Sequence, residues 1–135
     1  MFYEFAITVP ANTTQASPKK QELELTHGII QRIDVQFPIG TLALAHCRLE
    51  HHSFGHLPTN PTGSFATDGF IIPVDEYLEF FSAPYKIKAI CWNDDDTYAH
   101  TVTIRISIME SKRVLMFMNI LKGLTKLLQL MGIKV

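Results

Sequence analysis

Alternating apolar and polar residues run through most of the first 109 positions and predict β-strands. The clearest case is YAHTVTIRISIM at 98–109, where Val102, Ile104, Ile106 and Ile108 share one face and polar residues occupy the other. Turn sequences with Gly, Pro and Asn, rather than helices, separate the other strand-like segments, which span 3–9, 21–27, 28–37, 41–50, 70–81 and 83–92. Seven or eight short strands predict an all-β fold: an antiparallel β-sandwich, jelly-roll-like if eight strands form two packed sheets.

Parts of this strand pattern leave more than one interpretation open. Residues 53–69 contain several glycines and prolines and predict a long loop, and Pro73 divides 70–81 into one or two short strands. Both faces of 41–50 are partly apolar, so alternation does not say which face is buried. Strand order is likewise open, because alternation does not encode pairing.

The hydrophobic period changes from two to about 3.6 residues after position 109, which predicts a C-terminal amphipathic helix. Its polar residues fall on one narrow stripe, and the rest of its circumference is almost wholly apolar. We predict docking or oligomerisation through Val114, Phe117, Met118, Leu121, Leu124 and Leu128. The chain therefore divides into a β-sandwich domain at 1–109 and a docking helix at 110–135.

The apolar face of this helix is wider than the face that a helix needs when it packs on a single sheet. Contact with another protein or a second copy of the chain is the favoured interpretation, and packing on its own sandwich is the first alternative. A membrane surface is a further alternative, because basic residues on the polar stripe suit a lipid interface. We do not expect a bilayer span, since the longest uninterrupted apolar run is 114–118.

The composition is that of a globular protein with unevenly placed charges. Hydrophobic residues make up 47% of the 135 residues and charged residues 19%, and the net charge of −1 does not specifically imply nucleic acid. Residues 1–109 carry seven basic and twelve acidic side chains, a net charge of −5, whereas 110–135 carry +4. The first residues, MFYEFAITVP, lack the basic region of a signal peptide.

Four of the six histidines lie in HCRLEHHSFGHLPTN at 46–60, which raises the question of a metal site. Zinc needs three or four converging ligands, but adjacent His51 and His52 should point to opposite faces of a strand. The HxH spacing of cupins is absent, which disfavours a metal enzyme built from His46, His51, His52, His56 and His100. We predict no metal and favour solvated loop histidines near a strand end. If the segment has a function, we expect surface recognition, which His51, His52 and His56 would make pH-sensitive.

Other patterns of catalysis or ion binding are weak in this sequence. Cys47 and Cys91 lie in separate strand-like runs, which predicts buried thiols. No GxSxG, GxGxxG or GxxxxGK[ST] motif occurs. We interpret NDDDT at 93–97 as a solvated turn in which Asn93 caps its own backbone. The alternative is a calcium site formed by Asp94, Asp95 and Asp96. The sequence therefore predicts neither an enzyme nor a cofactor.

Aromatic residues in the second half of the chain supply the alternative function, a lectin-like module that binds a glycan or receptor. Exposed rings beside Asp and Asn suit a sugar, although most aromatic residues in proteins fill cores and loop bases. The residues concerned are Phe65, Phe70, Tyr77, Phe80, Phe81, Tyr85, Trp92 and Tyr98.

The order of the strand and loop segments resembles that of a group of viral structural proteins. The stretches EFAITVPANTTQASPKKQELELTHGIIQRIDVQFPIG, LPTNPTGSFATDGFIIPVDEY and APYKIKAICWNDDDTYAHTVTIRISI are similar to small jelly-roll proteins of tailed phages, namely minor capsid or head-decoration proteins. The resemblance covers 3–109 and rests on strands and loops rather than on a specific motif. It implies a non-enzymatic virion subunit, made in the host cytoplasm and often trimeric, which grips capsid-shell proteins. With the helix, it predicts a decoration protein that assembles with itself and with the shell.

Overall fold

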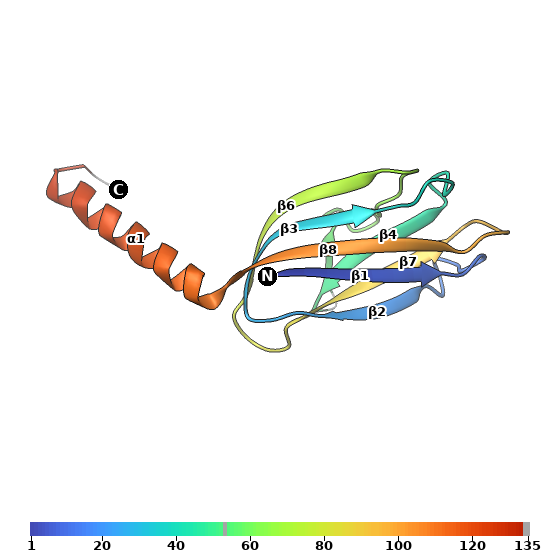
Figure 1. The fold of residues 1–135 in the computed structure, drawn as a ribbon, viewed down its shortest axis with the longest axis horizontal. Helices are drawn as coiled ribbons and strands as arrows, with labels where there is room; N and C mark the ends of the chain where they lie inside the picture. Colours follow the sequence, from blue (N-terminus) through green and yellow to red (C-terminus); the bar gives the residue numbers. More distant parts are fainter. Residues whose placement is uncertain (53, 134–135) are drawn as a thin grey trace.

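Within residues 1–52 and 54–133, which a computed structural model describes, the chain forms eight β-strands followed by one helix (Figure 1). The elements are β1 (Phe2–Val9), β2 (Lys19–Glu24), β3 (Gly28–Gln36), β4 (Ala45–His51), β5 (Phe54–Leu57), β6 (Ile71–Phe80), β7 (Lys86–Asn93), β8 (His100–Glu110) and α1 (Ser111–Leu130).

The described strands form two four-stranded antiparallel sheets that pack face to face. The first sheet has the order β1-β8-β3-β6 and the second has the order β2-β7-β4-β5. The chain passes from one sheet to the other at each connection except the hairpin between β4 and β5. Eight strands arranged in this way make a jelly roll, which confirms the predicted fold class.

The core lies between the two sheets and is built from one face of each strand. In β8 the face predicted to be apolar is buried: Val102, Ile104, Ile106 and Ile108 are at most 1% exposed. Burial of one large aliphatic side chain contributes about 1.5–3 kcal/mol, so this alternation determines the inward face of β8. The buried residues of β4, which alternation left undecided, are Ala45, Cys47 and Leu49.

The strand predicted at 41–50 is shorter in the structure. Leu42 and Ala43 have positive φ angles of 49° and 59°, a conformation in which the chain turns instead of extending. The strand β4 therefore begins only at Ala45. Alternating hydrophobicity did not reveal this turn, because leucine and alanine carry no turn signal.

Three other features of the strands differ from the prediction. The loop predicted at 53–69 contains β5, which pairs with the end of β4. The strand expected at 21–27 is shifted toward the N-terminus, as β2. Pro73 does not divide β6, because β6 lies at the edge of the first sheet, where a missing backbone N–H disturbs no inner pairing.

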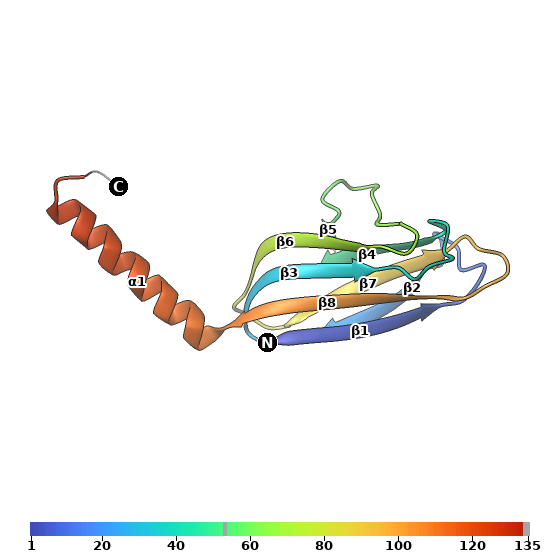
Figure 2. The ribbon, with the colours of Figure 1, turned by 45° about the horizontal axis from the view of Figure 1, so that its top comes forward.

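The helix α1 projects from one end of the sandwich instead of lying on it (Figures 1 and 2). It begins directly after β8, with no intervening loop. Its contacts with the sandwich involve β3 and β8. The N-terminus lies beside its root, where the amino group of Met1 donates to the carbonyl oxygen of Ile108 at 2.7 Å.

Candidate assembly surface

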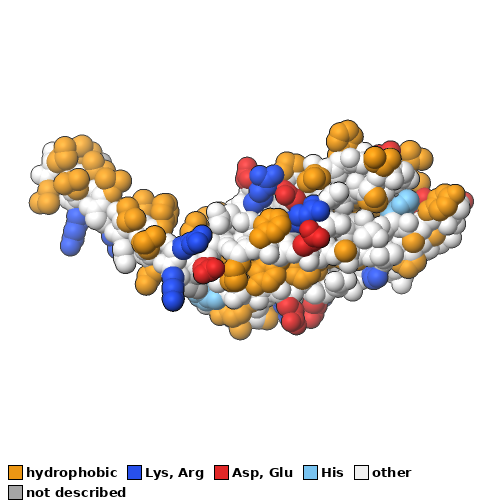
Figure 3. All heavy atoms as spheres, in the orientation of Figure 1, with side chains coloured by type: hydrophobic (Ala, Val, Ile, Leu, Met, Phe, Trp, Pro, Cys, Tyr) orange, Lys and Arg blue, Asp and Glu red, His pale blue; other side chains and the backbone are white. Residues whose placement is uncertain are grey.

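The helix exposes large apolar side chains over most of its circumference. The exposed fraction is 65% for Leu115, 54% for Phe117, 46% for Leu121, 50% for Leu124 and 85% for Leu130. Figure 3 shows hydrophobic side chains along α1, with a few basic side chains among them. A helix of this kind usually gains most of its stability from a covered face. Exposed apolar surface on this scale is typical of interaction sites.

A groove of about 360 Å³ lies at the root of the helix. Its sheet side includes Ile29 of β3 and Tyr77 and Glu79 of β6, and its helix side includes Phe117 and Leu121. Tyr77 is 67% exposed. The apolar surface of α1 therefore continues onto the outer face of the first sheet, with a carboxylate among the lining groups.

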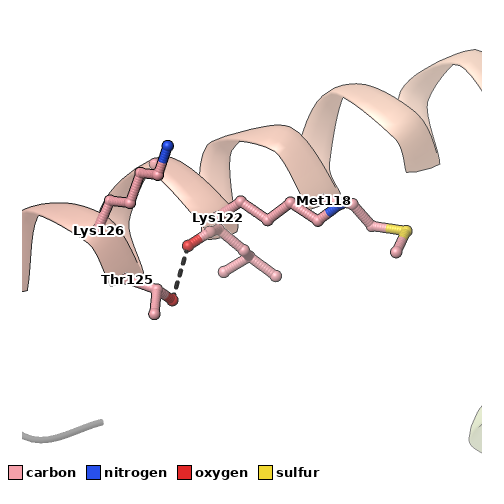
Figure 4. A pocket seen from close by; sticks show the side chains of 6 residues that line it. Met118, Lys122, Thr125 and Lys126 are labelled. Carbon is pink, nitrogen blue, oxygen red and sulfur yellow. Dashed lines mark hydrogen bonds between the residues drawn. The ribbon is translucent and has the colours of Figure 1, made fainter. Parts of the chain in front are cut away.

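A second hollow, of about 610 Å³, follows the middle of α1 (Figure 4). It is an open depression and not an enclosed cavity, because its lining residues all belong to one helix: Met118, Leu121, Lys122, Gly123, Thr125 and Lys126. A Cβ atom placed on Gly123 would meet nothing within 4 Å, so the helix surface at Gly123 is accessible to a partner. An apolar floor beside two lysines suits an apolar partner surface that also carries carboxylates.

The predicted interaction residues of the helix are mostly exposed. Phe117, Met118, Leu121 and Leu124 are exposed and Leu128 is partly buried. The side chain of Val114 lies outside the described side chains. Further exposed apolar residues lie outside this predicted set, on the circumference that the sequence indicated to be almost wholly apolar: Leu115, Met116, Ile120, Leu127 and Leu130. The prediction missed the sheet side of the root groove, which depends on strand pairing.

His51 and His52 lie at the end of the sandwich from which α1 projects. Their ring centroids are 3.8 Å apart, and the ring of His51 stacks on Phe80 at 4.6 Å. The expectation that they point to opposite faces is wrong, because His52 has a positive φ of 52° and leaves the strand. The side chain of His56 is outside those described. Among the described residues, no group of three or more His, Cys, Asp or Glu could hold a metal ion.

His46 takes part in an arrangement that the sequence did not predict. Its Nδ1 lies 3.0 Å from Ser64 Oγ, its Nε2 lies 3.2 Å from Asp94 Oδ2, and its ring stacks on Trp92 at 5.0 Å. The order of groups is that of a Ser–His–Asp relay, but Ser64 lines neither hollow described above, and the Asp94 side chain is 53% exposed. We interpret the arrangement as a latch that holds the loop carrying Ser64 against the second sheet.

The turn after β7 is held by internal hydrogen bonds. Asp95 accepts bonds from the backbone N–H groups of Thr97 (2.8 Å) and Tyr98 (3.2 Å) and from His100 Nε2 (2.8 Å). These bonds, that of Thr97 first, lower the pKa of Asp95. Asn93 Oδ1 accepts from the Asp95 N–H at 3.0 Å, which confirms the predicted cap. Asp94, Asp96 and Thr97 are exposed, as predicted for a solvated turn, whereas Asn93 and Asp95 are buried beneath it.

The aromatic residues do not form a single platform. Four of them are buried or packed against the core: Phe65, Phe80, Tyr85 and Trp92. Of the exposed ones, Tyr77 and Phe81 line the groove beside α1, whereas Phe70 and Tyr98 lie on connections at the opposite end of the sandwich. A sugar would not reach both groups at once.

Comparisons with protein-family models, with curated proteins and with solved structures found no match to this chain. Within the described residues, no helix has the length and apolar character needed to cross a membrane.

Proposed function

We propose that this protein is a non-enzymatic structural subunit of a viral particle, which assembles with further copies of itself and with shell proteins through α1. The observation that carries the proposal is an apolar helix that projects, uncovered, from a jelly roll. Viral capsid proteins use the jelly-roll architecture, as do lectins and cupins. Because a fold alone does not determine function, the exposed helix is what favours assembly among these uses.

Charge favours a second copy of the chain as a partner of the helix. Residues 1–109 carry a net charge of −5, and 110–135 carry +4. On α1, Lys122 and Lys126 border the apolar hollow, and on the sandwich Glu79 lines the root groove. A helix laid in the groove of a neighbouring copy would cover apolar surface on both chains and bring its lysines near that carboxylate.

Light scattering on the full chain and on a chain ending at Glu110 tests self-association. The sandwich core lies entirely within β1–β8 and the connections between them, so the shortened chain should keep its fold and thermal unfolding temperature. We expect the full chain to form an oligomer and the shortened chain to be a monomer. Equal oligomeric states of the two folded chains would contradict the proposed role of the helix.

Binding to particle shells tests the second half of the proposal. Both chains are incubated with shells purified from the lysate in which the protein is made, and bound protein is measured after sedimentation. The full chain should sediment with the shells in a fixed ratio, and the chain ending at Glu110 should stay in solution. A full chain that neither binds the shells nor occurs in native particles would refute a virion role.

A further inference from the structure

Cys47 of β4 and Cys91 of β7 face each other across the two central strands of the second sheet. The two residues are direct partners in the β4–β7 register, and the Cys91 thiol donates to Cys47 Sγ at 3.3 Å. Both side chains are fully buried. They are 44 positions apart in the sequence, so strand pairing alone brings them together.

The backbone geometry of this pair suits a covalent bond between the sulfurs. The N–H and C=O groups of Cys47 both bond to Phe65, at 3.0 and 2.8 Å, and therefore point away from β7. Cys47 and Cys91 thus form a non-hydrogen-bonded antiparallel pair, in which the Cα atoms are about 4.5 Å apart. Disulfides span Cα separations of about 4.4–6.8 Å, so the bond can form without moving the strands apart.

We propose that Cys47 and Cys91 form a cross-strand disulfide when the protein meets an oxidised disulfide such as glutathione disulfide. The thiolate of one cysteine attacks a glutathione sulfur, which releases one glutathione thiol and leaves a mixed disulfide. The second cysteine then attacks the protein-bound sulfur and releases the second glutathione thiol. The two protein thiols are oxidised, and the glutathione disulfide is reduced to two thiols.

The surroundings of the pair determine when this reaction occurs. The hydrogen bond with Cys91, together with burial, raises the pKa of Cys47 well above its ordinary value, and little of this thiol is ionised at neutral pH. Attack also requires a transient opening of the sheet, because neither sulfur is exposed. The pair should stay reduced in a reducing cytoplasm and become oxidised outside it. The expected place of oxidation rests on the proposed function, whereas the thiol–disulfide exchange itself does not.

The disulfide would stabilise the sandwich against unfolding. The loop that it closes contains β5, the connection to β6 and β6 itself, so it ties an edge strand of each sheet to the two central strands of the second sheet. Closing a long loop restricts the unfolded chain more than the folded one. We therefore expect the oxidised protein to have a higher thermal unfolding temperature, by several degrees, than the reduced protein.

The test uses the full chain in two arms. In one arm, folded reduced protein is incubated with glutathione disulfide at alkaline pH. In the other, reduced protein is refolded from urea in a glutathione redox buffer, so that slow opening of the fold does not limit the reaction. Free thiols are counted under denaturing conditions, and peptides are mapped by non-reducing mass spectrometry. We expect a single peptide pair joined through Cys47 and Cys91, and a chain mass lower by two hydrogen atoms.

Cys47→Ala and Cys91→Ala are the matched controls, and each should keep one thiol and lack the cross-link and the gain in unfolding temperature. The peptide map of the unmodified chain remains decisive if either variant fails to fold. Two free thiols in both arms, a persistent glutathione adduct, or a disulfide between two chains would each overturn the proposal. The readout is covalent, so it does not depend on whether the protein assembles.

Discussion

Replacement of Leu121 by glutamate should weaken self-association strongly, because this residue lines both hollows of the assembly surface. Its side chain is 46% exposed. Complete burial of a leucine contributes about 1.5–3 kcal/mol, so covering the remaining half contributes about 1 kcal/mol per chain. In a symmetric dimer the two copies lose about 2 kcal/mol, which raises the dissociation constant about 30-fold. Burial of the new carboxylate would weaken the dimer further.

Sedimentation velocity over a range of protein concentrations measures this effect. Asn119→Glu is the matched control, since it adds the same charge to an exposed position on the polar stripe of the same helix. Glutamate is a good helix former, so both variants should keep α1. If the two folded variants have dissociation constants within about threefold of each other, Leu121 is not buried in the interface. Burying a charge there would cost more free energy than a threefold change in the dissociation constant represents.

Two further predictions concern the stability of the sandwich. Asp95→Asn should lower the thermal unfolding temperature at pH 7. The pKa of Asp95 is lower in the folded state, so its contribution is present above the unfolded pKa of about 4 and is lost as the pH falls through the folded value. Unfolding curves at pH 7 and pH 3 check this, and an equal deficit at both would contradict it. Gly28→Ala should lower the free energy of unfolding by about 3 kcal/mol in urea titrations, since Gly28 has a φ of +154° and a Cβ there would collide with the carbonyl oxygen of Met109. A change under about 0.5 kcal/mol would show that the strand end relaxes freely.

Local patterns in the sequence were sufficient where a single period dominates. Alternation in β8 identified the buried face, and the change of period after residue 109 identified the helix and its apolar width. The cap by Asn93 was also predictable, because it involves residues two positions apart. The turn at Leu42 was not predictable in this way, because its positive φ angle carries no sequence signal.

The contacts between distant residues required strand pairing. Neither the latch of His46 with Ser64 and Asp94 nor the thiol pair has a spacing that a motif could reveal. Pro73 looked like a strand breaker until the sheet order placed β6 at an edge.

The sequence by itself determined most of the strands, their inward faces where one face is clearly apolar, and a C-terminal helix that is apolar over most of its circumference. These follow from the periodicity of side chains along the chain, which is a local property. Only the tertiary structure decided the order of strands, the inward face of β4 and the meeting of Cys47 with Cys91. Pairing and register depend on how two sheets share one core, and no single segment encodes that choice.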